Sequence, residues 1–508
     1  MSSTSLGKRQ WDSTWAGLPT EIRLMIFQAL IQDGCPLSGL VTVSEEWRSQ
    51  LEPYNFADIC VRPSNLVEFA SMTRRSRALV RYIWFCVELN EYEYCACWWH
   101  DSVNLDHWLI RAALAGLFSI LSTWEASEDL ILDISVYSPS DKDDWFKYLT
   151  FLPDIPSGDE VTQMELDKYY DELHESASGV PYSATPSGAI LRSFRTTTQY
   201  SPLASEFNWL EGLPRVPAVT SLRIRQQSRW RWLSPSLGPM LTCFPRLEEI
   251  HYEPWRNWGH NQGTDDIGNE ILLYMLPRFI KNLKRVVIFE NFNQQYPAII
   301  QRESTFFPSY CDSVRKPCPG AGEKMAIASL GLEHLAASFM VDARHFFAAI
   351  EPDWRWPQLT SLVFTSTCLR PGERRTAKIE ALLRAAAAAA MRMPRLESME
   401  IWNGKKGLAA LFRYQASPAR REATISWRCT WDLALEPCTI QAWKFAVQQQ
   451  HEDWELVVDQ KWLDEASIKS HGDAILQLGL LSSDIIRPIS WRQIQCEQRA
   501  LEGLPTVE

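Results

Sequence analysis

A short apolar pattern recurs six times from residue 219 onward and limits the folds that the chain can adopt. Each copy has an apolar residue, two variable residues, a second apolar residue, one variable residue and usually a third apolar residue. The copies start at Val219, Leu247, Leu283, Leu332, Leu359 and Leu396. Successive starts are 28, 36, 49, 27 and 37 residues apart, with helical sequence between them at 266–280 and 378–393. A repeated strand and helix predict parallel strands on one side and helices on the other.

This pattern resembles a divergent leucine-rich repeat, whose unit is roughly 20–29 residues long. The longer spacings then need insertions. Two earlier segments, 80–89 and 130–136, are rich in β-branched and aromatic residues and are expected to be preceding strands. After residue 422 we expect an atypical closing unit that covers the last apolar edge of the repeats. Its strands are expected at 424–433 and 454–459, and its helices at 440–449, 471–480 and 488–501. The expected fold class is therefore α/β: an irregular leucine-rich-repeat-like solenoid preceded by N-terminal helices.

The segment from Leu18 to Leu51 has the pattern of two amphipathic helices. Leu18-Pro19 places proline at a helix start, where its missing N–H costs nothing, and Glu21 in the first turn favours the helix dipole. Apolar residues then recur at steps of three and four, so we expect them to share one helical face. This first set is Ile22, Met25, Ile26, Ala29 and Leu30, with Phe27 widening the face. The second set, beyond a Gly/Pro break, is Leu37, Leu40, Val43, Trp47 and Leu51.

These residues resemble an F-box, which opens with Leu-Pro-x-Glu-Ile/Leu and an Ile-Phe pair and closes with Val-Cys-x-x-Trp-Arg. Here Ser44 replaces the usual cysteine and Glu45-Glu46 a commonly basic pair. The resemblance implies docking to the adaptor subunit of an SCF (cullin-type) ubiquitin ligase. The adaptor-binding residues would be Leu18, Pro19, Glu21, Ile22, Ile26, Phe27, Leu40, Val43 and Trp47. The whole chain is similar to a large fungal set of F-box-like proteins. The alternative for this segment is an ordinary helical hairpin buried in its own domain.

Composition narrows the class of protein. Hydrophobic residues make up 46% of the chain, enough for a sizeable core, and a net charge of -11 disfavours wholesale binding to nucleic acid or anionic membranes. The 12 cysteines are scattered, and residues 1–14 lack the apolar core of a signal peptide. The longest apolar stretch, 112–121, is far shorter than a membrane span. We therefore expect an intracellular protein, cytoplasmic and/or nuclear, with no membrane partner.

Changes in composition along the chain suggest its domain organisation. Residues 154–175 hold eight carboxylates and one lysine, and Gly, Ser, Pro and Thr dominate from there to residue 202. The expected division is a disordered tail at 1–14, an F-box-like helical module at 15–56, linker helices with the first repeat-like strands at 57–150, an acidic and polar insertion at 151–208, the divergent repeats at 209–422 and the closing unit at 423–508.

One basic and aromatic stretch is a candidate for target binding. No acid occurs between Gly212 and Leu247. In a strand, alternate side chains point to opposite faces, so the arginines would lie opposite Leu222 and Ile224. Arginines with neighbouring tryptophans could bind an acidic or phosphorylated segment. The residues are Arg223, Arg225, Arg229, Trp230, Arg231 and Trp232. Internal pairing with the acidic insertion is the alternative, and nucleic-acid binding is less favoured.

Signatures of catalysis and metal binding are weak. The sequence has no Gly-x-Ser-x-Gly elbow, His-Glu-x-x-His pair or phosphate-binding Gly-x-x-x-x-Gly-Lys-Ser/Thr loop. Cys95, Cys97 and His100 offer soft ligands, but zinc sites usually have wider cysteine spacing and a second pair. We expect no enzyme activity, metal or cofactor.

Together these features predict a substrate receptor. The N-terminal helices would bind the SCF adaptor, and through it a cullin, while the repeats hold an unknown target protein. The alternative is a leucine-rich-repeat scaffold without a ligase role, and a nucleic-acid-binding protein is a weaker one.

Overall fold

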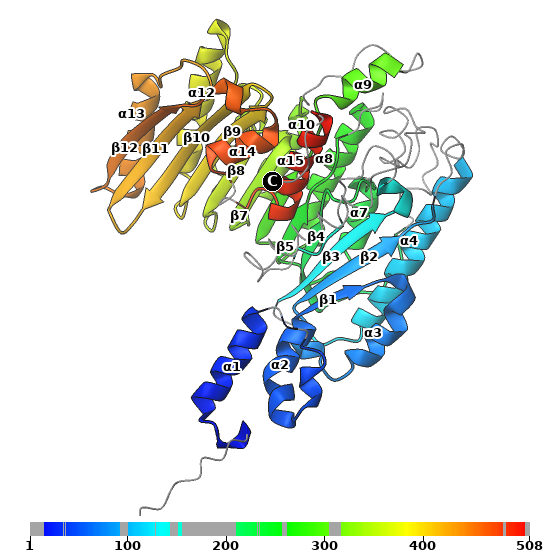
Figure 1. Ribbon diagram of the computed structural model, residues 1–508. Helices are drawn as coiled ribbons and strands as arrows, with labels where there is room; N and C mark the ends of the chain where they lie inside the picture. Colours follow the sequence, from blue (N-terminus) through cyan, green and yellow to red (C-terminus); the bar gives the residue numbers. More distant parts are fainter. Residues whose placement is uncertain are drawn as a thin grey trace, which may run out of the picture.

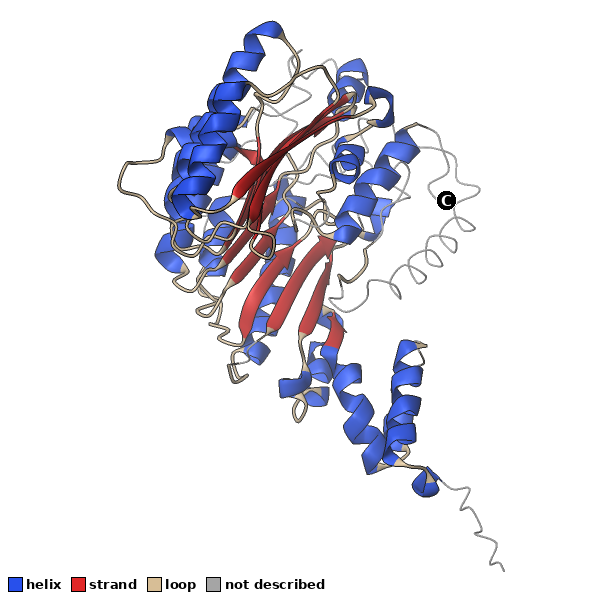
Figure 2. Cartoon of the chain, turned by 90° about the vertical axis from the view of Figure 1, so that its left-hand side faces the viewer, coloured by secondary structure: helices blue, strands red, loops and turns tan. Residues whose placement is uncertain are grey.

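The computed structural model contains one long sheet with helices packed on both of its faces (Figures 1 and 2). Described residues are 15–33, 35, 37–91, 100–126, 129–142, 151–154, 210–230, 232, 234–256, 262–303, 316–480 and 484–502. The expected tail at 1–14 and nearly all of the acidic insertion lie outside these residues, as do Cys95, Cys97 and Arg231.

The twelve described strands lie side by side in the order of the sequence. Neighbours run parallel from β1 to β9, β10 is antiparallel to both β9 and β11, and β11 and β12 are parallel again. The strands are β1 (Asp58–Val61), β2 (Tyr82–Glu88), β3 (Leu130–Tyr137), β4 (Val219–Ile224), β5 (Glu249–Tyr252), β6 (Arg285–Phe289), β7 (His334–Asp342), β8 (Ser361–Thr365), β9 (Ser398–Lys405), β10 (Leu408–Ser417), β11 (Glu422–Cys429) and β12 (Glu455–Trp462).

The helices differ in where they lie relative to the sheet. α1 and α2 project from the β1 end of the sheet (Figure 1). Most of the others pack on one face, here called the helix face, whereas α14 and α15 pack on the opposite, second face. The helices are α1 (Thr20–Gln32), α2 (Glu45–Ala57), α3 (Leu66–Met72), α4 (His100–Leu121), α7 (Ser234–Leu241), α8 (Gln262–Phe279), α9 (Tyr296–Glu303), α10 (Pro319–Ala328), α11 (Ala343–Ala348), α12 (Glu373–Ala390), α13 (Pro437–Gln450), α14 (His471–Leu478) and α15 (Pro488–Leu501).

The six repeated segments form consecutive parallel strands, as the spacing predicts. Their second apolar residues occupy matching positions in the ladder and are buried on the helix face, in the order Leu222, Ile250, Val286, Leu335, Leu362 and Met399. The backbone N–H of the residue after each leading leucine donates to the carbonyl of the corresponding residue in the preceding segment. The Glu248 N–H, for example, donates to the Thr220 carbonyl at 2.8 Å. The pattern thus encodes both the strand and the face that it buries, and the α/β class is confirmed.

The closing unit differs from its expected role. β11, α13 and β12 extend the edge of the sheet, but α14 and α15 return to cover its second face. That face is apolar over its middle strands, where Phe289, Phe339 and Trp402 are buried. These rings need cover, since an exposed apolar area of this kind is unfavourable in water. The C-terminal helices therefore protect a face of the sheet rather than only its end.

Two strands were absent from the sequence-based expectations. β1 directly follows α2, so the N-terminal helices are joined to the edge strand without a linker. β10 pairs with β9 through the turn at Lys406 and Gly407, where Gly407 has φ +71. The sheet therefore changes from parallel to antiparallel pairing at β9.

Candidate functional site

The N-terminal helical module, residues 15–57, has a small aromatic interior. Trp15, Phe27 and Trp47 contact one another with ring centroids 4.8–5.4 Å apart. The Trp15 indole donates a hydrogen bond to the Glu46 carboxylate at 2.9 Å, and Arg23 pairs with the same carboxylate. Contacts between aromatic rings of this kind add to the stability gained by burying their area. The cluster fixes how α1 packs on α2.

The outer side of α1 remains apolar and uncovered. Leu18, Ile22 and Met25 are 37%, 43% and 61% exposed, and Val43 in the connection to α2 is 60% exposed. Ile22 and Met25, three residues apart in α1, share one side of the helix, with Phe27 on the opposite side, and Leu18 lies just before the helix. We call Leu18, Ile22, Met25 and Val43 the exposed apolar face. Large apolar side chains left exposed on a small module commonly mark an interaction site.

The predicted adaptor-binding residues divide by burial. Leu18, Pro19, Glu21, Ile22 and Val43 are exposed, and Ile26, Leu40 and Trp47 are half-buried. Phe27 is only 2% exposed and belongs to the aromatic interior. The sequence pattern placed Phe27 on the same face as Ile22, but the helical rotation between them turns it inward.

The predicted target-binding stretch lies inside the molecule. Arg223, Arg225, Arg229, Trp230 and Trp232 are each at most 6% exposed, and the remaining candidate, Arg231, lies outside the described residues. These five side chains therefore do not form an accessible recognition surface in this conformation.

Buried carboxylates accompany the arginines. Arg225 Nε lies 2.7 Å from Asp133 Oδ2, and Arg223 lies 2.9 Å from Asp154 Oδ2. Arg487, just before α15, lies 2.6 Å from the same Asp154 oxygen. Asp154 stands at the start of the acidic insertion, so this pair is the internal pairing that the sequence left open as an alternative.

The electrostatics favour the charged form of Asp154 and of Glu253, whereas burial outweighs the arginines at Asp133 and raises the pKa of that carboxyl. Burial alone would raise the pKa of Asp154, but Arg225, Arg487 and Arg223 outweigh it and hold that pKa below its ordinary value. For Glu253, the hydrogen bond from His251 is foremost among the contacts that overcome burial and lower the pKa.

The same group of buried arginines and carboxylates also holds the C-terminal helices on the sheet. Glu253 at the end of β5 accepts hydrogen bonds from the Arg487 N–H and the Ser490 hydroxyl. Arg229 lies 3.1 Å from Glu497 on α15, and Asn293 donates to Glu497 at 2.7 Å. We call these contacts between the second face and the C-terminal segment the buried polar network. Sequence reasoning missed the individual partners of the arginines, although Asp133 inside the apolar strand segment 130–136 was a signal for the partner of Arg225.

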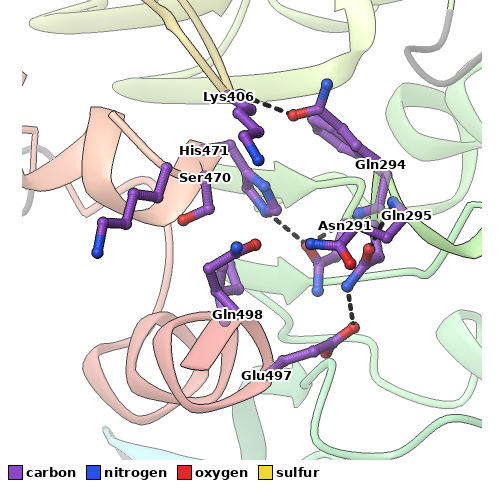
Figure 3. A pocket seen from close by; sticks show the side chains of 12 residues that line it. Asn291, Gln294, Gln295, Lys406, Ser470, His471, Glu497 and Gln498 are labelled. Atoms are coloured by element: carbon purple, nitrogen blue, oxygen red, sulfur yellow. Dashed lines mark hydrogen bonds between the residues drawn. The ribbon is translucent and has the colours of Figure 1, made fainter. Parts of the chain in front are cut away.

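One open pocket lies beside this network (Figure 3). The loop after β6 and the β9–β10 turn form part of its wall. The start of α14 and one side of α15 form the rest. The space not filled by atoms there is about 380 Å³, a figure that includes open solvent. Its labelled walls include Gln294, Lys406, Ser470, His471 and Gln498.

His471 is a fixed part of the pocket wall. Its Nε2 lies 2.8 Å from Asn291 Oδ1, which also accepts the Phe292 N–H, so we assign the proton of that contact to the histidine. Burial lowers the pKa of His471 to about 3. The imidazole is therefore neutral and committed to an internal hydrogen bond.

The described residues offer no assembled metal centre. No group of three or more His, Cys, Asp or Glu side chains among them could hold a metal ion. Cys95 and Cys97 are outside the described residues, as is the side chain of His100. Among the helices described, none is long and apolar enough to cross a membrane.

A family model matches part of the chain. Residues 275–487 match a family of unknown function, DUF6546. The matched segment runs from within α8 to Arg487 and leaves out the N-terminal helical module. The curated proteins contain no match to this chain.

Proposed function

We propose that this protein is a substrate receptor of an SCF ubiquitin ligase. The N-terminal helical module binds the adaptor subunit, and the sheet domain binds a target protein. Catalysis then belongs to other subunits, and this chain contributes proximity between the target and the ubiquitin-loaded enzyme.

The exposed apolar face is the observation on which this proposal mainly depends. Four apolar residues of the F-box-like pattern, Leu18, Pro19, Ile22 and Val43, are accessible while the aromatic interior keeps the two helices in place. Interfaces gain most of their affinity from a few central side chains buried on binding. An apolar face on a projecting module suits such a role better than it suits a helical hairpin buried in its own domain.

The order of the strands supports the second half of the proposal. Parallel strands in sequence order with helices on one face resemble a divergent leucine-rich repeat, an architecture used for protein binding. The antiparallel β9–β11 segment and the C-terminal helices on the second face depart from that pattern. The nucleic-acid alternative has lost its support from Arg223, Arg225 and Arg229, which pair internally.

Point variants of α1 provide the sharpest test. Ile22 and Leu24 are 43% and 42% exposed on the same helix but point to different sides. We expect Ile22→Ala to weaken binding of the purified adaptor subunit roughly tenfold, as truncation of an interface anchor does. Leu24→Ala is the matched control and should leave the affinity within about twofold.

A truncation would be less informative. Deleting residues 1–60 also removes most of β1, the edge strand of the sheet. If the folded wild-type protein shows no adaptor binding, or if both substitutions weaken it equally, the proposed docking surface is wrong. The first result would favour a protein-binding scaffold without a ligase role.

A further inference from the structure

The pocket beside the C-terminal helices is built from four separate parts of the chain. The loop at 291–295, the turn at Lys406, the segment 469–471 and one side of α15 converge on it (Figure 3). The Lys406 N–H donates to Gln294 Oε1 at 2.7 Å and so joins two of these parts. His471 and Asn291 join the segment 469–471 to the same loop, and Asn293 joins α15 to it through Glu497. The walls are therefore cross-linked by hydrogen bonds, and the cavity is part of the folded structure.

Two lysines, Lys406 and Lys469, belong to the pocket lining. Figure 3 shows the Lys406 side chain extending toward the interior, and Lys406 makes no ion pair with any described residue. Lys469 has one distant carboxylate, with its Nζ 3.8 Å from Glu502 Oε2. Both ammonium groups can therefore accept a further carboxylate without losing a strong partner.

The acidic groups at the pocket are already engaged. Glu497 is 3% exposed and is held by Arg229 and Asn293. Asp473 caps α14, where its Oδ2 accepts the N–H groups of Lys469 and Ser470. The pocket thus presents positive charge to an incoming ligand.

Amide side chains complete the lining. Gln294, Gln295 and Gln498 stand on the pocket walls and can donate or accept hydrogen bonds. Gln294 uses its carbonyl oxygen for the Lys406 N–H, which leaves its NH₂ group as a donor. Ammonium groups beside amides suit a peptide whose side chains carry carboxylates and whose backbone needs hydrogen-bond partners.

We propose that this pocket binds an acidic peptide segment, with Lys406 and Lys469 pairing to its Asp or Glu side chains. Assigning that segment to the target protein rests on the proposed function. Peptide binding itself does not, since it needs neither the adaptor nor the N-terminal helical module.

Fluorescence anisotropy with labelled hexaglutamate and the full-length protein tests the proposal. We expect saturable binding, weakened by roughly tenfold or more in the double variant Lys406→Gln/Lys469→Gln, since each exposed ion pair supplies a modest share of the affinity. Lys444→Gln, which removes an exposed lysine from α13, should bind like the wild type. Restoring the charge with Lys406→Arg/Lys469→Arg should recover most of the affinity.

Labelled hexaglutamine and the adaptor measurement separate the possible failures. Equal binding of hexaglutamine, or equal binding of hexaglutamate by the double variant and the wild type, would overturn the proposal. So would no binding of hexaglutamate by folded wild-type protein at millimolar peptide. Loss of adaptor binding in Ile22→Ala with intact peptide binding would show that the two sites act independently, so the failure of one proposal would leave the other standing.

Discussion

Replacing Arg225 with methionine tests whether the arginines of the stretch 223–232 are held in internal ion pairs or are available to bind a target. The side chains of Arg225 and Asp133 are both 0% exposed and lie 2.7 Å apart. Arg225 also donates to Gln227 Oε1 at 2.8 Å and to the Leu152 carbonyl at 2.9 Å. Methionine fills similar space but leaves the Asp133 carboxylate buried without its cation, although the Tyr82 hydroxyl still donates to it. Removing one partner of a buried ion pair costs about 3–5 kcal/mol of unfolding free energy.

Urea denaturation followed by circular dichroism would measure that loss. Arg420→Met is the control, because the Arg420 side chain is 77% exposed and its pair with Glu422 spans 3.4 Å, so the cost should stay below about 1 kcal/mol. The double variant Asp133→Asn/Arg225→Met should be more stable than Arg225→Met alone, since no uncompensated charge remains. A loss for Arg225→Met as small as that of Arg420→Met would refute the buried pairing.

Three further outcomes follow from the packing and the electrostatics. Phe27→Ala should lower the free energy of unfolding by about 3 kcal/mol because it opens the aromatic interior. Proteolysis within α1 should then be faster, and unchanged cleavage would contradict that packing. His471 has its folded pKa lowered to about 3, so stability is full above about pH 6.5 and falls by about 1.4 kcal/mol per pH unit below it. His471→Gln should flatten that loss between pH 6.5 and 4, and parallel pH curves would count against it. Gly404→Ala would place a methyl group 2.5 Å from the Ala474 side chain, so hydrogen exchange should show lower protection of α14, and unchanged exchange would disprove the close approach.

The sequence located the strands well because each copy of the pattern has a local physical meaning. Leu222, Ile250 and Val286 occupy adjacent rungs on the helix face, so spacing alone indicated strands and their buried side. β10 was missed even though Gly404 and Gly407 flank a possible hairpin turn. A repeat of parallel strands predicts no hairpin after β9. The structure has one there, because β10 turns back and pairs antiparallel with β9.

The second face shows where sequence reasoning stopped. Val287, Ala336 and Val363 alternate with helix-face residues, so these strands are apolar on both sides. Such runs are typical of strands covered on both faces, and this signal was available. Which segment provides the cover depends on contacts between distant parts of the chain, as between Arg229 and Glu497. Local periodicity does not specify such contacts, and for that reason the sequence left both a recognition surface and internal pairing open for the arginines.

For the receptor proposed above, the covered second face limits where its target can bind. Solenoid proteins commonly use an open concave surface for binding, but here α14 and α15 lie on the second face and the buried polar network holds them there. Lifting them would separate Arg229 from Glu497 and Arg487 from Asp154, and would expose rings such as Phe339 to water. Breaking buried ion pairs and exposing apolar area both oppose such an opening. A target is therefore expected to bind at the rim of the C-terminal helices, where the lysine-lined pocket is already open, rather than beneath them.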